Sequence, residues 1–275
     1  MENVSGASSK NYTKHNIELL VPALIRITDA DIQFPWHSID SDTQAYFEAL
    51  KAEANGETIP SPSTFALTLL RTKGAYAPAV GMIHFLNNVF NDLSSVLTEP
   101  EKKMACSIVK KILLTFNPTF YHFVGEIATL NNLMATKRYR LKHIEEGLPN
   151  GNSIDFHLQT IETDERILVE VLNIDLDSDR VESDPGAIDK FIAHRAKKKF
   201  REKNEDLPDP EQFQLIPVLW GGHADIEVYR QHFKDHRATP ANVVEPLAYL
   251  RHSDGQYYFD HQFGRVGNLI RRDIP

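Results

Sequence analysis

The stretch SIDFHLQTIETDERILVEVLN, from Ser153 to Asn173, decides the fold that this sequence predicts. It contains most of two apolar runs, NSIDFHLQT (152–160) and RILVEVLNI (166–174), which the polar segment ETDE separates. Hydrophobic and polar residues alternate in the first run, whereas the second is almost continuously apolar, and both patterns are typical of β-strands. Because the connection is short, we expect the two strands to pair antiparallel.

Each strand carries one carboxylate in an apolar setting: Asp155 in SIDF and Glu170 in LVEV. On paired antiparallel strands these two groups can lie close together, where they repel each other and resist the loss of water. A divalent cation removes both penalties, and the hard carboxylate oxygens suit Mg²⁺ or Mn²⁺. The competing interpretation of the two strands alone is a sheet with one wet face, on which both carboxylates point to solvent.

The composition is ordinary for a globular protein: of the 275 residues, 41% are hydrophobic and 25% are charged. No apolar run approaches the roughly 20 residues needed to span a bilayer, and the polar start of the sequence lacks the apolar region of a secretory signal. The single cysteine, Cys106, excludes an internal disulfide and falls in an apolar helical pattern, which favours a buried structural thiol. We therefore expect a cytoplasmic protein with no membrane partner.

The sequence pattern changes near Asn117 and divides the chain into parts. Residues 1–14 predict a loose tail and residues 15–117 a helical region, in which Thr98 and Glu101 match a capping box. Residues 118–275 predict an α/β core with these elements in order: a helix near 120–137, strands at 139–147, 152–160 and 166–174, a basic helix at 184–204, an apolar strand at 213–222, and a C-terminal hairpin around Asp254 and Gly255. The predicted fold class is therefore α+β.

The order helix, strand, strand, strand, helix, strand, with acids at these positions, resembles the PD-(D/E)XK nuclease superfamily. The resemblance covers roughly 120–222 and implies a restriction-endonuclease-like α-β-β-β-α-β core. It implies that Asp155 and Glu170 bind Mg²⁺ or Mn²⁺ and that Glu126, on the preceding helix, joins them. It also implies hydrolysis of a phosphodiester bond in nucleic acid by water that the metal activates. The literal PD dipeptide is absent, because Pro149 is separated from Asp155.

Two residues near this predicted site have structural alternatives. Glu126 lies in FVGEIATL at the edge of an apolar helix face, where a glutamate bonded to a neighbouring side chain fits as well as a metal ligand. His157 shares a strand face with Asp155 and is a candidate acid–base or metal partner, but a histidine on a strand is more often a half-buried polar residue. The sequence leaves both alternatives open.

The family pattern also has a lysine two residues after the second acid, where it would orient the attacking water and neutralise developing charge. Here that position is Leu172, and no basic residue is adjacent. The basic helix is the nearest other source, and Lys190, His194 and Lys197 share one stripe of it at i, i+4 and i+7. We take Lys190, near the helix start, as the candidate catalytic lysine. The competing explanations are a metal site with little or no cleavage, and a fold kept as a binding scaffold.

The net charge of −8 argues against a surface that is basic all over, but two segments concentrate positive charge. We expect them to form one nucleic-acid-binding groove beside the carboxylates, although solvated faces also explain such runs. The candidate contacts are Lys137, Arg138, Arg140, Lys197 and Lys198. The leading functional hypothesis is thus a Mg²⁺- or Mn²⁺-dependent nuclease. The alternatives are an inactive nuclease-fold protein that binds nucleic acid or a protein partner, and a helical interaction protein whose sheet carries no site.

Overall fold

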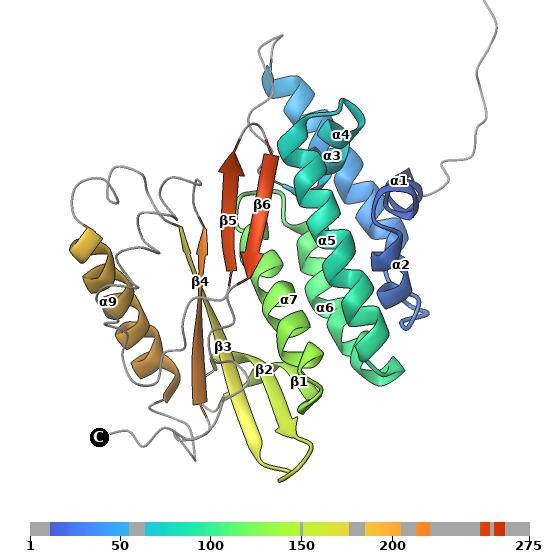
Figure 1. The fold of residues 1–275 in the computed structure, drawn as a ribbon. Coiled ribbons are helices and arrows are strands. Elements are labelled where there is room, and N and C mark those ends of the chain that lie inside the picture. Colours follow the sequence, from blue (N-terminus) through green and yellow to red (C-terminus); the bar gives the residue numbers. More distant parts are fainter. Residues whose placement is uncertain are drawn as a thin grey trace, which may run out of the picture.

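The computed structural model describes residues 12–54, 64–148, 151–175, 185–204, 213–220, 248–253 and 256–261. Within this part of the chain the protein is α+β, because a helical N-terminal region precedes the strands of a mixed sheet (Figure 1). This agrees with the fold class that the sequence predicts. No helix in the described ranges is both long and apolar enough to cross a lipid bilayer.

The helices of the N-terminal region begin and end where the sequence has turn formers and caps. Pro22 occupies the first position of its helix, where its missing N–H costs nothing. The first helix already begins at Tyr12, so residues 12–14 of the predicted tail (1–14) are helical, and residues 1–11 lie outside the described part. The helices are α1 (Tyr12–Leu20), α2 (Pro22–Thr28), α3 (Trp36–Ala54), α4 (Phe65–Lys73), α5 (Ala77–Val96), α6 (Glu99–Leu114) and α7 (Phe120–Ala135).

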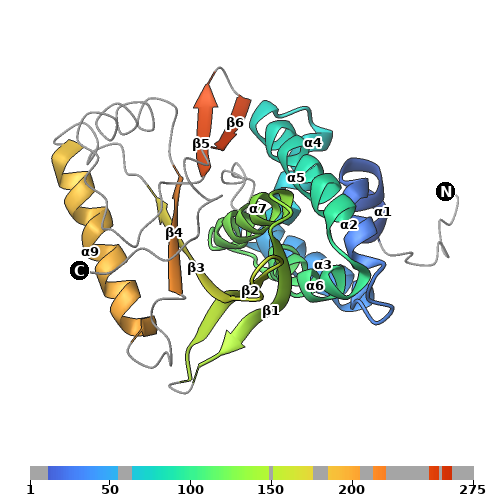
Figure 2. The same cartoon turned by 60° about the horizontal axis from the view of Figure 1, so that its bottom comes forward.

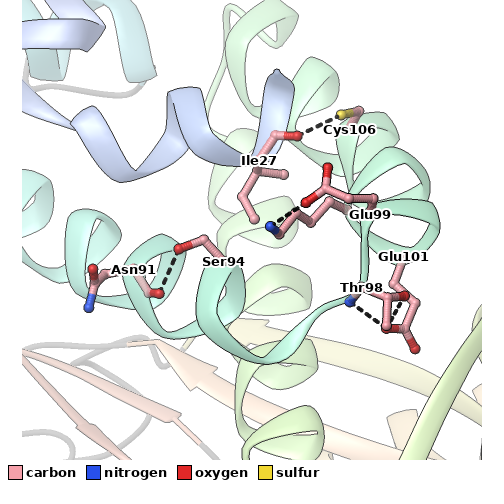
Figure 3. Close-up of polar contacts among 8 residues, drawn as sticks. Ile27, Asn91, Ser94, Thr98, Glu99, Glu101 and Cys106 are labelled. Atoms are coloured by element: carbon pink, nitrogen blue, oxygen red, sulfur yellow. Dashed lines mark hydrogen bonds and ion pairs between the residues drawn. The ribbon is translucent and has the colours of Figure 1, made fainter. Parts of the chain in front are cut away.

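The start of α6 is held by the predicted capping box, whose carboxylate also contacts the sheet. Thr98 donates its backbone N–H (2.8 Å) and its hydroxyl (2.7 Å) to Glu101 Oε2, a pair of contacts visible in Figure 3. The other oxygen, Glu101 Oε1, accepts the backbone N–H of Leu141 at 2.8 Å. One buried glutamate therefore satisfies a helix start and a strand amide together.

Apolar side chains from the helices and from one face of the sheet form a single core. Its members include Phe90 on α5, Ile108 on α6 and Ile127 on α7, together with the strand residues Phe156 and Val169. Helix α7 lies between the sheet and the other helices (Figure 2). The core thus joins the helical region to the strands that carry the predicted site.

Cys106 on α6 belongs to this core, which confirms the prediction of a buried thiol. Its Sγ lies 3.5 Å from the carbonyl oxygen of Ile27, to which the thiol donates (Figure 3). Burial, with a smaller contribution from the charge of Asp31, raises the pKa of Cys106 to about 12. A thiol with this pKa stays protonated at neutral pH and is a poor nucleophile.

Among the described residues the sheet has six strands in the order β1-β2-β3-β4-β5-β6. The first three strands pair antiparallel, and the chain then crosses through helix α9 (Pro185–Asn204) so that β4 lies parallel to β3. Strand β5 is parallel to β4 and pairs antiparallel with β6, as predicted for the C-terminal hairpin, whose turn residues lie outside the described part. The strands are β1 (Tyr139–Gly147), β2 (Ser153–Thr160), β3 (Arg166–Asp175), β4 (Phe213–Trp220), β5 (Ala248–Ser253) and β6 (Gln256–His261).

The register of β2 and β3 determines which side chains face the helical region. Phe156 pairs with Val169, and both belong to the core shared with the helices. Since strand side chains alternate, Asp155 and Glu170 lie on the opposite face. Helix α9 contacts β3 and β4, and both views show it on the side of the sheet away from α7 (Figures 1 and 2). Strand β3 is therefore covered on both faces, which explains its continuous apolar run.

Gly125 allows α7 to pack closely against the sheet. A Cβ at this position would lie 2.1 Å from Asn173 Oδ1. Asn173 is held in place, because its Oδ1 accepts from Trp220 Nε1 (2.9 Å) and its Nδ2 donates to the carbonyl oxygen of His122 (3.2 Å). The close approach also brings the next residue of α7, Glu126, toward the strands.

We expect Gly125→Ala to lower the free energy of unfolding by about 1–2 kcal/mol, because displacing the Asn173 network outweighs the gain in helix propensity. Urea denaturation followed by circular dichroism measures this difference. Gly147→Ala is the matched control, since a Cβ there meets no atom within 4 Å. Equal losses in the two variants would show that α7 does not need this close approach.

Candidate active site

Glu170 on β3 is a buried acid with only 2% of its side chain exposed. Two ammonium groups of α9 reach one of its oxygens, because Lys199 Nζ lies 2.7 Å and Lys203 Nζ 3.4 Å from Oε1. The other oxygen, Oε2, is buried and has no hydrogen-bond partner among the described residues. One oxygen of Glu170 is therefore paired, and the other remains to bind a ligand.

Asp155 on β2 is fixed beside Glu170 by the backbone of the neighbouring strand. Its Oδ2 accepts the N–H of Val171 at 2.7 Å. Burial is the main cause that raises the pKa of Asp155 to about 7, and the negative charge of Glu170 raises it further. The Val171 N–H and the two lysines oppose this shift without cancelling it. The positive charge around Asp155 is therefore too small to stabilise its ionised form fully, although the neighbouring strand holds the carboxyl group in place.

Glu126 brings a third acid to the same neighbourhood from α7. The residue is half-buried, and burial raises its pKa well above the usual value. The charges of Asp155 and Glu170 raise this pKa too, while Lys111 and Lys199 lower it. The structure thus places the three acids predicted from the sequence on three elements, close enough for their charges to interact.

The donor set fits a hard divalent cation. Three carboxylates supply only oxygen, which Mg²⁺ and Mn²⁺ prefer, and Glu170 Oε2 is a buried oxygen without a partner in the described part of the chain. Among the described residues, however, no three Asp, Glu, His or Cys side chains are grouped closely enough to hold a metal ion. One oxygen of Glu170 accepts Lys199, and this ammonium group is an alternative to a metal cation as the source of positive charge at the carboxylate.

The lysines at the site differ from the one that the sequence suggested. Lys190 is exposed near the start of α9, nine residues before Lys199, and therefore roughly 13 Å away along the helix axis. The stripe that faces the sheet instead contains Ala196, Lys199 and Lys203 at i, i+3 and i+7, of which Ala196 is 1% and Lys203 8% exposed. The sequence alone does not single out these two lysines, because basic residues are spread around the helix.

The two basic segments do not share one groove. Lys137, Arg138 and Arg140 are exposed at the start of β1, which is the first strand in the sheet order. Lys197 and Lys198 are exposed on α9, which contacts β3 and β4, and Lys198 Nζ lies 3.8 Å from Glu202. Figure 2 shows the separation of β1 from α9 across the sheet. The two segments therefore lie on separate elements, one at the start of β1 and the other on α9.

His157 shares a face with Asp155 but is engaged by other charged residues. Its Nδ1 lies 2.5 Å from Glu146 Oε2, and the guanidinium of Arg166 donates to Glu146 Oε1 at 2.5 Å. Burial is the main cause that lowers the pKa of His157, although the charge of Glu146 raises it. The geometry therefore gives His157 a structural role beside the site and does not place it among the acids.

Comparison of the chain with protein-family models, with curated proteins and with solved structures found no match. Function must therefore be inferred from the chemistry of the site itself.

Proposed function

We propose that this protein is a metal-dependent nuclease that hydrolyses phosphodiester bonds in nucleic acid. Asp155, Glu170 and Glu126 would hold Mg²⁺ or Mn²⁺. The order α7-β1-β2-β3-α9-β4, with β4 parallel to β3, is the order that the PD-(D/E)XK resemblance implies, and it supports the proposal. The observation that carries the proposal is the ammonium group of Lys199, which α9 supplies at Glu170 in place of a lysine at position 172.

Lys199 has the charge that this role requires. Burial disfavours its charged form, but the charge of Glu170, a hydrogen bond to the same carboxylate and the charge of Asp155 together raise the pKa of Lys199. It therefore remains a cation at neutral pH, able to orient a water molecule and to stabilise negative charge that develops on phosphorus oxygens. Lys203 is a positioning residue, since it contacts Glu170 and donates to the carbonyl oxygen of Ser153.

The reaction is a substitution at phosphorus. When bound, a divalent cation supplies Lewis acidity and lowers the pKa of water. The oxygen of water forms a bond to phosphorus and loses a proton to solvent, while one ester P–O bond breaks and its leaving oxygen takes up a proton from solvent. The products are a phosphate monoester and a free hydroxyl group. The carboxylates hold the cation, and the lysine faces the charge that appears during this exchange.

A non-catalytic protein of the same fold, which binds nucleic acid or a protein partner, is the second candidate. It is favoured by Leu172, which is buried on β3 where the family pattern has lysine. A helical interaction protein without a site is the third, and the clustering of buried acids and lysines speaks against it.

The test is cleavage of end-labelled single-stranded DNA, double-stranded DNA and RNA in Mn²⁺, Mg²⁺ or EDTA, with products resolved on denaturing gels. We expect cleavage in a divalent cation, none in EDTA, and a loss of about 100-fold or more in Glu170→Gln. Glu165→Gln is the matched control, because Glu165 is exposed in the turn after β2. Equal cleavage by wild type and Glu170→Gln would contradict the proposal, and no cleavage by any form would favour the second candidate.

A further inference from the structure

A cavity lies away from the carboxylates, where the end of α5, the start of α6 and the start of β1 meet. It is an open cavity of about 690 Å³, a size that accommodates small organic ligands. Apolar side chains of Val96, Met104, Met134 and Ile161 form part of its wall. Ile161 keeps 44% of its surface exposed, so its apolar side chain is accessible to a ligand. The wall therefore offers apolar surface to a flat organic group.

Three cations stand around this wall: Lys137, Arg140 and Lys142. The one acid among the described lining residues, Glu101, forms no ion pair with them: its oxygens accept hydrogen bonds from Thr98 (Figure 3) and from the backbone of Leu141. No ion pair joins any of the three cations to an acid in the described part of the chain. In a protein with a net charge of −8, such a concentration of positive charge favours an anionic ligand.

The backbone of Lys137 adds an independent observation. Lys137 follows the C-cap of α7 with φ +57°, a left-handed conformation that glycine normally supplies at this point of a helix end. Its N–H donates to the carbonyl oxygen of Met134 at 3.0 Å, which closes the helix. A lysine at this position costs conformational energy, and its side chain lines the cavity. Strain of this kind is common at binding sites.

We propose that this cavity binds one nucleotide of a single nucleic-acid strand. The phosphate would contact the three cations, and the unpaired base would lie against Ile161 and the methionines. A nucleotide joins an anionic phosphate to a flat, largely apolar ring, and the cations and the apolar wall of the cavity fit these two groups. This inference rests on the proposed function, because the bound strand would be the substrate.

The position of the cavity suits such a strand. Arg140 pairs with Gln159 across β1 and β2, so the two side chains share a sheet face. Asp155 lies four residues before Gln159 on the same face, roughly 13 Å away at about 3.3 Å per residue. Arg140 therefore connects the cavity, at the edge of the sheet, with the sheet face that carries the acids.

The test is fluorescence anisotropy with a short labelled single-stranded DNA in EDTA at low salt, so that binding is measured without cleavage or metal. We expect Lys137→Gly to bind several-fold more weakly and to lower the slope of log K against log salt by about 0.7, the value for one phosphate contact on a single strand. The same variant should melt at a higher temperature, because glycine relieves the left-handed strain. Ala75→Gly is the matched control: Ala75 has φ +55°, so its variant should also melt higher, but with unchanged DNA affinity.

Ile161→Ser tests the base contact. It should weaken binding of the oligonucleotide but leave binding of inorganic polyphosphate, a probe without bases, unchanged. Wild-type affinity for DNA in both Lys137→Gly and Ile161→Ser would overturn the inference, and so would an absence of DNA binding by the wild type. Because the assay contains no metal, its failure is distinguishable from failure of the nuclease proposal, which depends on cleavage and on Glu170.

Discussion

Lys199→Met is expected to reduce nucleic-acid cleavage by about 10²–10³-fold while Mn²⁺ binding stays intact or becomes tighter. Methionine keeps much of the length of the side chain but removes the charge that faces the reacting phosphate. The Glu170 oxygen that now accepts Lys199 at 2.7 Å would then keep only the longer contact to Lys203, at 3.4 Å, and could bind a cation more readily. Single-turnover cleavage measures the first effect, and calorimetric titration with Mn²⁺ measures the second.

Two other lysines of α9 make this experiment specific. At saturating nucleic acid, Lys190→Met and Lys198→Met should cleave at the wild-type rate, because both residues are exposed and neither contacts an acid of the site. A role of Lys198 in binding nucleic acid would change the affinity and not this rate. A large loss in Lys190→Met with normal cleavage in Lys199→Met would restore the lysine that the sequence suggested. It would also show that α9 adopts another position when substrate binds.

Asp155→Asn is expected to stabilise the metal-free protein above pH 7. The folded carboxyl has a pKa of about 7 against a usual value of 3.8, so the folded state holds its proton more tightly than the unfolded state does. Below about pH 4 the Asp155 carboxyl is protonated in both the folded and the unfolded state, so the wild type loses no stability there. Between about pH 4 and 7 the unfolded state loses its proton first, and the stability of the wild type falls. Above pH 7 the full penalty is present, on the order of 2 to 4 kcal/mol.

Asparagine can still accept the N–H of Val171 but carries no charge, so this penalty should be absent in the variant. Melting temperatures in EDTA across this pH range give the difference between the two proteins, in which other titrating groups cancel. Mn²⁺ should raise the melting temperature of the wild type and not that of the variant. A variant that is less stable than the wild type at every pH would contradict a charge penalty at Asp155.

The strands and the acids could be predicted from the sequence because alternation along a strand is rigid. Asp155 has apolar neighbours on both sides in a run with period two, which leaves only one face for its carboxylate. The lysine could not be predicted in the same way. Basic residues occupy every phase of the helix between residues 190 and 203, so its sequence does not show which of them faces the sheet. Only the packing of α9 on β3 and β4 selects Lys199 and Lys203.

The sequence also could not predict the cavity or the relative positions of the two basic segments. The cavity is built from 95–104, 134–142 and 161, which become neighbours only when α6 packs against β1. The run that contains Lys137 and the run that contains Lys197 look alike in composition. Their distance depends on the strand order, which places β1 first and β4 fourth.

The contact of Glu101 with Leu141 has a consequence for the solubility of the protein. Strand β1 is the first strand of the sheet, and an open sheet edge is a template to which a strand of another molecule can add. The carboxylate at the start of α6 occupies an amide of this edge strand, and it is buried there, so that amide is closed to an incoming chain. The helical region therefore closes one amide of this edge to strand addition, in addition to completing the core beneath it.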